Sequence, residues 1–167
     1  MLAGTKPSAP VSSSYVNPFD YGSWSPARID EGVDWIPNSV SPVVAIGDGV
    51  VTYSSMESGW PAGGFISYRL TSGSHAGLYI YVAEHITNLA PVGTVVSAGE
   101  QIATALPGYP WTEWGWAAAE GPEPAPGSQY GGAADGTATA GGKAFARFLI
   151  SLGAAVVENP GPGPTTP

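Results

Sequence analysis

Short apolar runs separated by glycine-rich turns fill the middle of the chain, and this pattern predicts strands. Residues 43–46 and 50–53 flank a Gly-Asp-Gly turn at 47–49, whose Asp-Gly pair accepts the positive φ of a tight hairpin. The remaining runs of this kind are 65–70, 78–84, 92–96, 101–105 and 112–117. We therefore expect about seven short antiparallel strands.

A single segment, residues 143–153, has the periodicity of a helix. Its apolar residues fall on one helical face: Phe145, Phe148, Leu149 and Leu152. Gly153 follows as a stop signal. The pattern thus predicts one C-terminal helix, which would pack on the strands.

Composition divides the chain into five parts. We expect an extended Ser/Pro-rich arm (1–28), a β domain (29–120), a Gly/Pro-rich loop (121–142), the helix (143–153) and a Pro/Gly tail (154–167).

The charge of the chain excludes several classes of partner. Among its 167 residues are 5 Lys and Arg against 13 Asp and Glu, which gives a net charge of −8. Nucleic acid and anionic membrane surfaces attract clustered Lys and Arg, so neither is expected as a partner. No run approaches the ~18 apolar residues of a membrane span, and no signal-peptide pattern is visible. Cysteine is absent, which excludes disulfides and a thiolate metal site.

A strand-turn-strand unit occurs twice. Residues 43–52 align without gaps on 95–104, with two Val, one Gly and one Thr identical. The second copy resembles the hybrid motif of lipoyl and biotinyl carrier domains. The two lysines, Lys6 and Lys143, lie outside the β region, so a swinging-arm carrier is excluded. Two copies of the unit predict a sandwich built from a duplicated half.

Four segments occur in an order that carries a family resemblance. They are 32–34 (Gly-Val-Asp), 45–51 (Ala-Ile-Gly-Asp-Gly-Val-Val), 81–86 (Tyr-Val-Ala-Glu-His-Ile) and 113–116 (Glu-Trp-Gly-Trp). They resemble the corresponding segments of lysostaphin-type zinc peptidases, which contain a duplicated hybrid motif. The resemblance implies a mainly β fold, an antiparallel β-sandwich or barrel-sandwich, across roughly residues 28–118.

The zinc centre of that family is degenerate in this sequence. The family holds zinc with the His and Asp of a His-x-x-x-Asp motif and one His of a His-x-His strand. The resemblance places Asp30 and Asp34 on the first motif, and Trp114 and Trp116 on the second. Residues 114 and 116 point to one face, and an indole has no lone pair for a metal. We therefore expect two Trp in the metal position, no metal or other cofactor, no catalytic residues and no enzyme activity.

Asp30, Asp34 and His85 have two interpretations. Either they hold a weakly bound cation, or the aspartates cap turns and His85 is a partly buried histidine; we favour the second. Glu84 beside His85 is interpreted as a coincidence, because neighbouring strand residues point to opposite faces.

These features predict a non-catalytic structural or binding subunit on a peptidase-like scaffold. We expect it in a phage particle or another extracellular assembly, with copies of itself or other subunits as partners. One alternative is a metal-dependent peptidoglycan endopeptidase with atypical ligands. The other is a cell-wall or carbohydrate-binding module that uses an aromatic cluster, although core packing would also explain each member. That cluster comprises Trp60, Tyr68, Trp111, Trp114 and Trp116.

Overall fold

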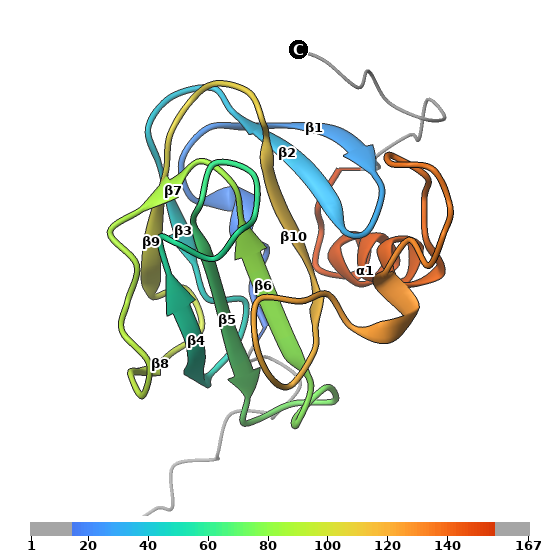
Figure 1. The fold of residues 1–167 in the computed structure, drawn as a ribbon. Coiled ribbons are helices and arrows are strands. Elements are labelled where there is room, and N and C mark those ends of the chain that lie inside the picture. The colour runs from blue at the N-terminus through green and yellow to red at the C-terminus, as the bar shows by residue number, and fades with distance from the viewer. Residues whose placement is uncertain (1–14, 156–167) are drawn as a thin grey trace, which may run out of the picture.

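The computed structural model describes residues 15–155, whose ten strands form two antiparallel sheets (Figure 1). The larger sheet has the order β1 (Trp24–Ile29), β2 (Val33–Pro37), β10 (Thr112–Ala117), β6 (Tyr79–Ala83), β5 (Phe65–Leu70), β4 (Gly49–Ser55) and β8 (Val95–Val96). The smaller sheet has the order β3 (Ser41–Val44), β9 (Gln101–Ala105) and β7 (Ile86–Thr87). This confirms the predicted mainly antiparallel β fold.

The two copies of the repeated unit connect the two sheets. In the first copy β3 of the smaller sheet leads into β4 of the larger one, and in the second copy β8 leads back into β9. Strand β4 pairs with β8, and β3 pairs with β9. The turns also meet: Asp48 Oδ1 accepts a hydrogen bond from Ala98 N (2.9 Å), and Ala45 N donates to Glu100 O (2.8 Å). Each copy therefore completes the hydrogen bonding of the other.

The hairpin predicted around 47–49 is wrong. Strands β3 and β4 lie in different sheets, and neither Asp48 nor Gly49 has a positive φ. The Asp48 carboxylate accepts a hydrogen bond from the other copy, so this turn carries the chain across to the second sheet. An Asp-Gly pair is a local signal, and here a long-range contact decides the turn.

Residues 15–28 pack on the domain, which corrects the predicted arm over 1–28. Strand β1 begins at Trp24, and Phe19 of the 3₁₀ turn η2 (Pro18–Asp20) stacks on Trp35 with ring centroids 3.6 Å apart. The Tyr15 hydroxyl donates to Ser72 O and accepts from His75 N, both at 2.8 Å. The rest of the predicted arm, 1–14, and residues 156–167 of the predicted tail lie outside the described residues.

The C-terminal helix α1 (Ala140–Ser151) begins before the predicted residue 143. Thr139 caps it by accepting a hydrogen bond from Gly142 N at 3.0 Å. Gly142 lies so close to β1 that an added Cβ would come 2.2 Å from Asp30 O. Glycines are poor helix formers, so the sequence pattern did not predict that the helix begins at Ala140. The contact of Gly142 with Asp30 fixes this start. The turn η3 (Pro126–Ser128) precedes the helix within the loop 121–142.

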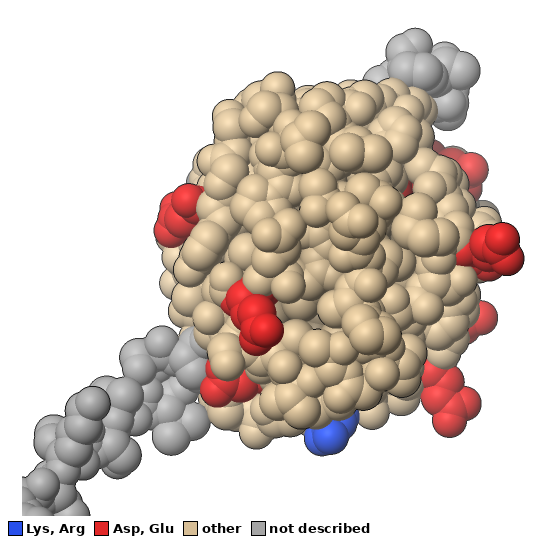
Figure 2. All heavy atoms as spheres, turned by 90° about the vertical axis from the view of Figure 1, so that its left-hand side faces the viewer, with Lys and Arg blue, Asp and Glu red and all other residues tan. Residues whose placement is uncertain are grey.

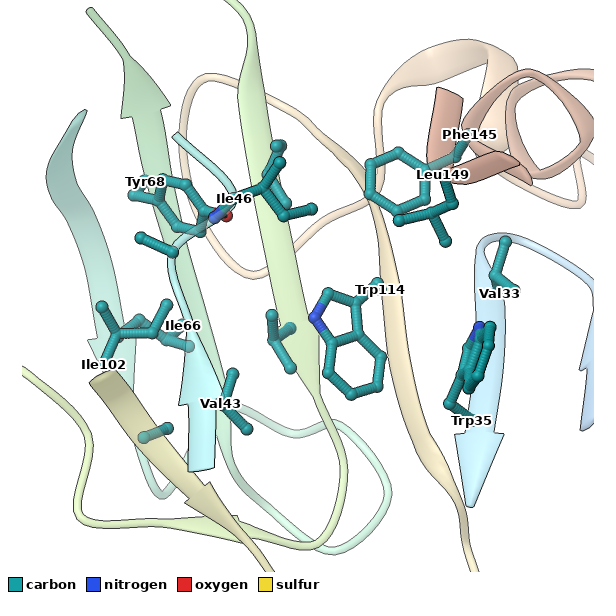
Figure 3. Close-up of a cluster of buried hydrophobic side chains, with 14 of the residues drawn as sticks. Val33, Trp35, Val43, Ile46, Ile66, Tyr68, Ile102, Trp114, Phe145 and Leu149 are labelled. Carbon is teal, nitrogen blue, oxygen red and sulfur yellow. Dashed lines mark hydrogen bonds between the residues drawn. The ribbon is translucent and has the colours of Figure 1, made fainter. Parts of the chain in front are cut away.

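The predicted apolar face of α1 is buried. Phe145, Leu149 and Phe148 are 0%, 2% and 7% exposed, and Leu152 packs partly buried on the same core. Figure 3 shows Phe145 and Leu149 of α1 in one cluster with Val33 and Trp35 of β2 and with Trp114 of β10. The helix thus extends the core beyond the edge of the smaller sheet.

One face of the molecule carries few charges. Figure 2 shows the side that lies to the left in Figure 1, near β4, β8 and β9, and uncharged residues cover most of it. Val92 and Val95 are 60% and 75% exposed. No helix among residues 15–155 has both the length and the apolar character needed to cross a membrane.

Replacing a buried residue of α1 should destabilise the domain. Phe145→Ala removes a fully buried ring, so we expect the free energy of unfolding to fall by about 3–5 kcal/mol. Ile150→Ala, at a position of the same helix that is 42% exposed, serves as the control and should change it by less than about 0.5 kcal/mol. Urea unfolding measures both, and equal effects would show that α1 is not part of the core.

Candidate active site

An open cleft of about 530 Å³ lies where β1, β2 and β10 meet the loops that follow β4, β6 and β9. Its charged residues come from six segments: Arg28, Asp30 with Glu31, Asp34, Glu84, Glu113 and Asp135. Aromatic residues line the rest: Trp60, Tyr109, Trp111 and Tyr130. Acidic and aromatic side chains therefore dominate this cleft.

Strand register places three of the charged side chains side by side. Arg28 of β1 and Glu113 of β10 are each paired with Asp34 of β2. Residues directly opposite in antiparallel strands point to the same face, so these three side chains meet in the cleft. The pairing of the strands thus fixes the order of charges.

The turn between β1 and β2 adds Asp30. Asp30 N donates to Gly32 O at 2.9 Å, and Asp30 Oδ1 accepts from Gly32 N at 3.3 Å. Gly32 passes close to β10, where an added Cβ would lie 2.2 Å from Trp114 O. Thr139 holds the carbonyl of Asp30 with its backbone N (2.9 Å) and its hydroxyl (3.0 Å). Gly32 and the cap residue of α1, Thr139, therefore hold Asp30 in place.

Asp30, Asp34 and Glu113 form a buried carboxylate cluster. One oxygen of each lies within 4.8 Å of the others, and the residues are only 2%, 3% and 3% exposed. Arg28 makes ion pairs with Asp30 Oδ2 (3.1 Å) and Asp34 Oδ2 (2.7 Å). Asp34 Oδ1 is buried and has no hydrogen-bond partner among the described residues. Three buried carboxyl groups therefore lie near one guanidinium, which forms ion pairs with two of them.

Burial raises the pKa of several carboxyl groups in the cleft. Burial and the charges of Asp30 and Asp34 raise the pKa of Glu113 well above its usual value. Burial and the neighbouring Asp34 raise the pKa of Glu84 to about 9. Burial and Asp30 also raise the pKa of Asp34, against the opposing effect of Arg28. The cleft therefore favours the protonated form of Glu113, which has a carboxyl oxygen within 4.8 Å of one of Asp30.

The side chain of Tyr81 holds the carboxyl group of Glu113 in position. Its buried hydroxyl donates a hydrogen bond to Glu113 Oε2, and Tyr81 is paired with Gly115 in the sheet. A Cβ on residue 115 would lie 2.6 Å from Tyr81 Cε1 and 2.8 Å from its hydroxyl. Glu113 and Gly115 lie on the same face of β10, so the phenol fills the space that a side chain at 115 would take.

The two indoles predicted at the metal position lie elsewhere. Trp114 is 0% exposed in the core, where it packs against Phe19 and Trp24 with centroids 4.8 and 5.0 Å away. Trp116 packs against Phe145 at 5.1 Å, and neither indole lines the cleft. A shift of one residue in the alignment of a strand exchanges the side chains on its two faces. In β10, Glu113 faces the cleft and Trp114 faces the core. The predicted indole-filled centre is therefore wrong.

Asp30 and Asp34 do lie together, but His85 does not join them. Its imidazole does not line the cleft, and its buried Nδ1 has no hydrogen-bond partner within residues 15–155. Glu84 and His85 have φ of 71° and 48°, so the strand alternation used to dismiss Glu84 does not apply to them. Glu84 reaches the cleft instead, and it is a site residue that the sequence analysis missed, together with Arg28, Tyr81 and Glu113.

The predicted aromatic cluster divides into two groups. Trp60 and Trp111 are half-buried at the cleft, where Trp111 packs edge-on against Tyr109 at 5.5 Å. Tyr68 is 0% exposed in the core, where its hydroxyl accepts from Ile46 N (2.9 Å). Of the five predicted binding residues, Trp60 and Trp111 alone line the cleft.

Comparison with known proteins identifies the fold. No family model and no curated protein matches the chain. The solution structure of lysostaphin matches with a TM-score of 0.54 and 19% identity, over 93% of this chain and 62% of that one. A crystal structure of a protein assigned as the glycyl-glycine endopeptidase LytM, from Ruminococcus gnavus, matches with a TM-score of 0.42 and 23% identity, over 55% of this chain and 41% of that one. The chain has the lysostaphin-type fold, as its sequence motifs predicted, and it spans less than two thirds of either matched chain.

The prediction that the chain is not an enzyme is contradicted. Its fold matches that of lysostaphin, after which the zinc peptidases that the sequence motifs resemble are called, and the indoles on which the prediction depended lie outside the site. A cluster of carboxyl groups lies in their place.

Zinc, which the resemblance implies, does not fit this cleft. Catalytic zinc sites use imidazole or thiolate ligands, and the cleft is lined by neither. The three carboxyl groups are close enough for a cation, but Arg28 already pairs with two of them and the third, Glu113, accepts a hydrogen bond from the Tyr81 hydroxyl. We assign no zinc ligand to this chain.

A side chain at residue 115 should disrupt the support of Glu113. Gly115→Ala would push the Tyr81 ring aside, and we expect it to lower the free energy of unfolding by about 1–3 kcal/mol. Gly127→Ala is the matched control, because no atom lies within 4 Å of a Cβ there. Urea unfolding of the two variants tests this, and an unchanged Gly115→Ala protein would contradict the packing of Tyr81.

Stability should fall as pH rises from mildly acidic to alkaline values. Folded Glu84 keeps its proton up to about pH 9, whereas the unfolded chain releases it near the ordinary value of 4.5. The folded state therefore binds more protons in this window, and each such group removes up to about 1.4 kcal/mol of stability per pH unit. Glu84→Gln should flatten the slope, and the exposed Glu57→Gln should keep it. Urea unfolding at pH 5, 7 and 9 measures this; stability that rises with pH would contradict it.

Proposed function

We propose that this chain is a cell-wall peptide hydrolase in which Asp30 and Glu113 perform the proton transfers. The observation that carries the proposal is the cluster of buried carboxyl groups in an open cleft, with oxygens of Asp30 and Glu113 within 4.8 Å of each other. Two neighbouring carboxyl groups whose environments favour different protonation states can act as base and acid in one reaction. The lysostaphin-type fold supports a peptide as the substrate.

The proposed reaction uses one water and no further reactant. Asp30 accepts a proton from the water as the water oxygen bonds to the carbonyl carbon. The C–N bond then breaks, its electron pair stays on nitrogen, and Glu113 donates its proton to that nitrogen. The proton on Asp30 then passes to Glu113, whose carboxyl oxygen lies within 4.8 Å of one of Asp30, and this restores the starting state.

Two neighbours support this division of roles. Arg28, 3.1 Å from Asp30 Oδ2, supplies positive charge beside the base. Tyr81 donates to Glu113 Oε2 and orients the carboxyl group, so that its other oxygen carries the proton. Both side chains hold reacting groups in position, which is where much of the rate of an acid–base reaction arises.

A cell-wall substrate would place the chain outside the cell, in agreement with the predicted extracellular location. Location in a virion and association with copies of itself or other subunits stay predictions. The weakly charged face near β8 and β9 supports self-association, because charge-poor surfaces are the less costly ones to bury (Figure 2).

Removing the proton of Glu113 tests the proposed function. We expect the protein to release new amino groups from purified peptidoglycan, and Glu113→Gln to slow this by about 10²–10⁴-fold, since the amide cannot serve as the acid. Glu57→Gln, at an exposed residue that does not line the cleft, should keep the wild-type rate.

Three results would contradict the proposal. They are release of reducing sugar ends instead of amino groups, a Glu113→Gln variant that is as fast as the wild type, and activity that a chelator removes and zinc restores.

A further inference from the structure

Carboxyl groups outnumber cationic groups in the cleft. Six carboxyl groups line it against one guanidinium: Asp30, Glu31, Asp34, Glu84, Glu113 and Asp135. The guanidinium of Arg28 is already paired with Asp30 and Asp34. Burial raises the pKa of Glu84 to about 9, so Glu84 holds a proton at neutral pH in the empty cleft, and a cation that enters can replace this proton and pair with the carboxylate. The composition of this cleft therefore favours a cationic ligand.

Two of these carboxyl groups have acceptor atoms without a partner. Asp34 Oδ1 is fully buried and accepts no hydrogen bond from any residue in 15–155. Glu84 is 9% exposed and lines the cleft, and its carboxyl group makes neither a hydrogen bond nor an ion pair with another described residue. A buried acceptor that lacks a donor, such as Asp34 Oδ1, is unfavourable. A ligand that brings N–H donors would remove this deficit.

The aromatic part of the cleft suits an ammonium group as well. Trp60, Tyr109 and Trp111 line it beside the acidic residues, with Tyr130 contributed by the loop before α1. The face of an aromatic ring attracts an organic cation that has lost part of its water. A strongly hydrated metal ion would gain little from these rings, whereas an alkylammonium group gains from both the rings and the carboxylates.

We propose that the cleft selects peptides that carry a free primary ammonium group, which enters between the aromatic residues and the unpartnered acceptors of Asp34 and Glu84. This inference rests on the proposed peptide hydrolysis, from which it takes a peptide as the class of ligand. It adds that the peptide carries a positive charge. The ammonium can be the amino terminus of a peptide or a lysine-like side chain, because the chemistry of recognition is shared.

Binding to the full chain, measured by calorimetry, tests the proposal. The probes are a pentaglycine amide with a free amino group, its N-acetyl form, and the N-acetyl form with one glycine replaced by lysine. We expect the two cationic peptides to bind about tenfold or more tightly than the neutral one, with a difference that shrinks as salt is added. Equal binding of all three would overturn the proposal; a preference for only one cationic peptide would identify which amine is recognised and support it.

Two variants locate the site. Glu84→Gln should bring the affinity for the cationic peptides close to that for the neutral one, and the exposed Glu57→Gln should leave all three affinities unchanged. If Glu84→Gln proves unstable, Asp135→Asn at the exposed edge of the cleft should reduce the same preference by a smaller factor. A preference that survives in both variants would overturn the assignment to this cleft.

The outcome separates this inference from the proposed function. Selective binding of cationic peptides without cleavage of peptidoglycan would support the binding site and contradict the hydrolase. Cleavage with equal rates and affinities for free and acetylated amines would support the hydrolase and overturn the selectivity.

Discussion

Arg28 forms ion pairs with two aspartates that are almost completely buried, at 3.1 Å to Asp30 and 2.7 Å to Asp34. A buried carboxylate without compensation is unfavourable by several kcal/mol, and a single guanidinium cannot offset three of them. Burial and neighbouring carboxylates therefore raise the pKa of Glu113, which favours its protonated, uncharged form. The strand register makes this arrangement unavoidable: moving β10 by one residue would put Glu113 into the apolar core and Trp114 into the cleft. The burial of Trp114 in the core thus fixes the register that places Glu113 beside Asp30 and Asp34.

Rigid backbone contacts hold the same cluster from the other side. The cap residue of α1, Thr139, binds the carbonyl of Asp30, and Gly142 lies against that carbonyl. Gly32 lies against the backbone of Trp114. Neither glycine could carry a side chain, so the turn that contains Asp30 is confined between α1 and β10. A reacting pair of carboxyl groups needs such fixed geometry, because a displacement of about 1 Å weakens proton transfer strongly.

The sequence predicted the fold better than the site, for identifiable reasons. Strands follow from apolar periodicity, and the family resemblance placed Asp30 and Asp34 on one motif, which the structure does bring together. Glu113 was missed because Glu113-x-Gly115 and Trp114-x-Trp116 are equally possible alignments, and only the packing of the core distinguishes them. Glu84 was missed because its φ of 71° breaks the alternation that a strand would impose. The helix start and the turn at 47–49 were misplaced because contacts distant in sequence decide them.

Charge and chemistry in the cleft are linked through the proton on Glu113. The charges of neighbouring carboxylates help to raise its pKa, so a positive group that enters the cleft lowers it again. In the proposed reaction, this lower pKa would make Glu113 a better acid when a cationic substrate is bound. The acidic lining therefore couples ligand charge to acid strength, a link that a zinc–imidazole centre on the same scaffold would not need.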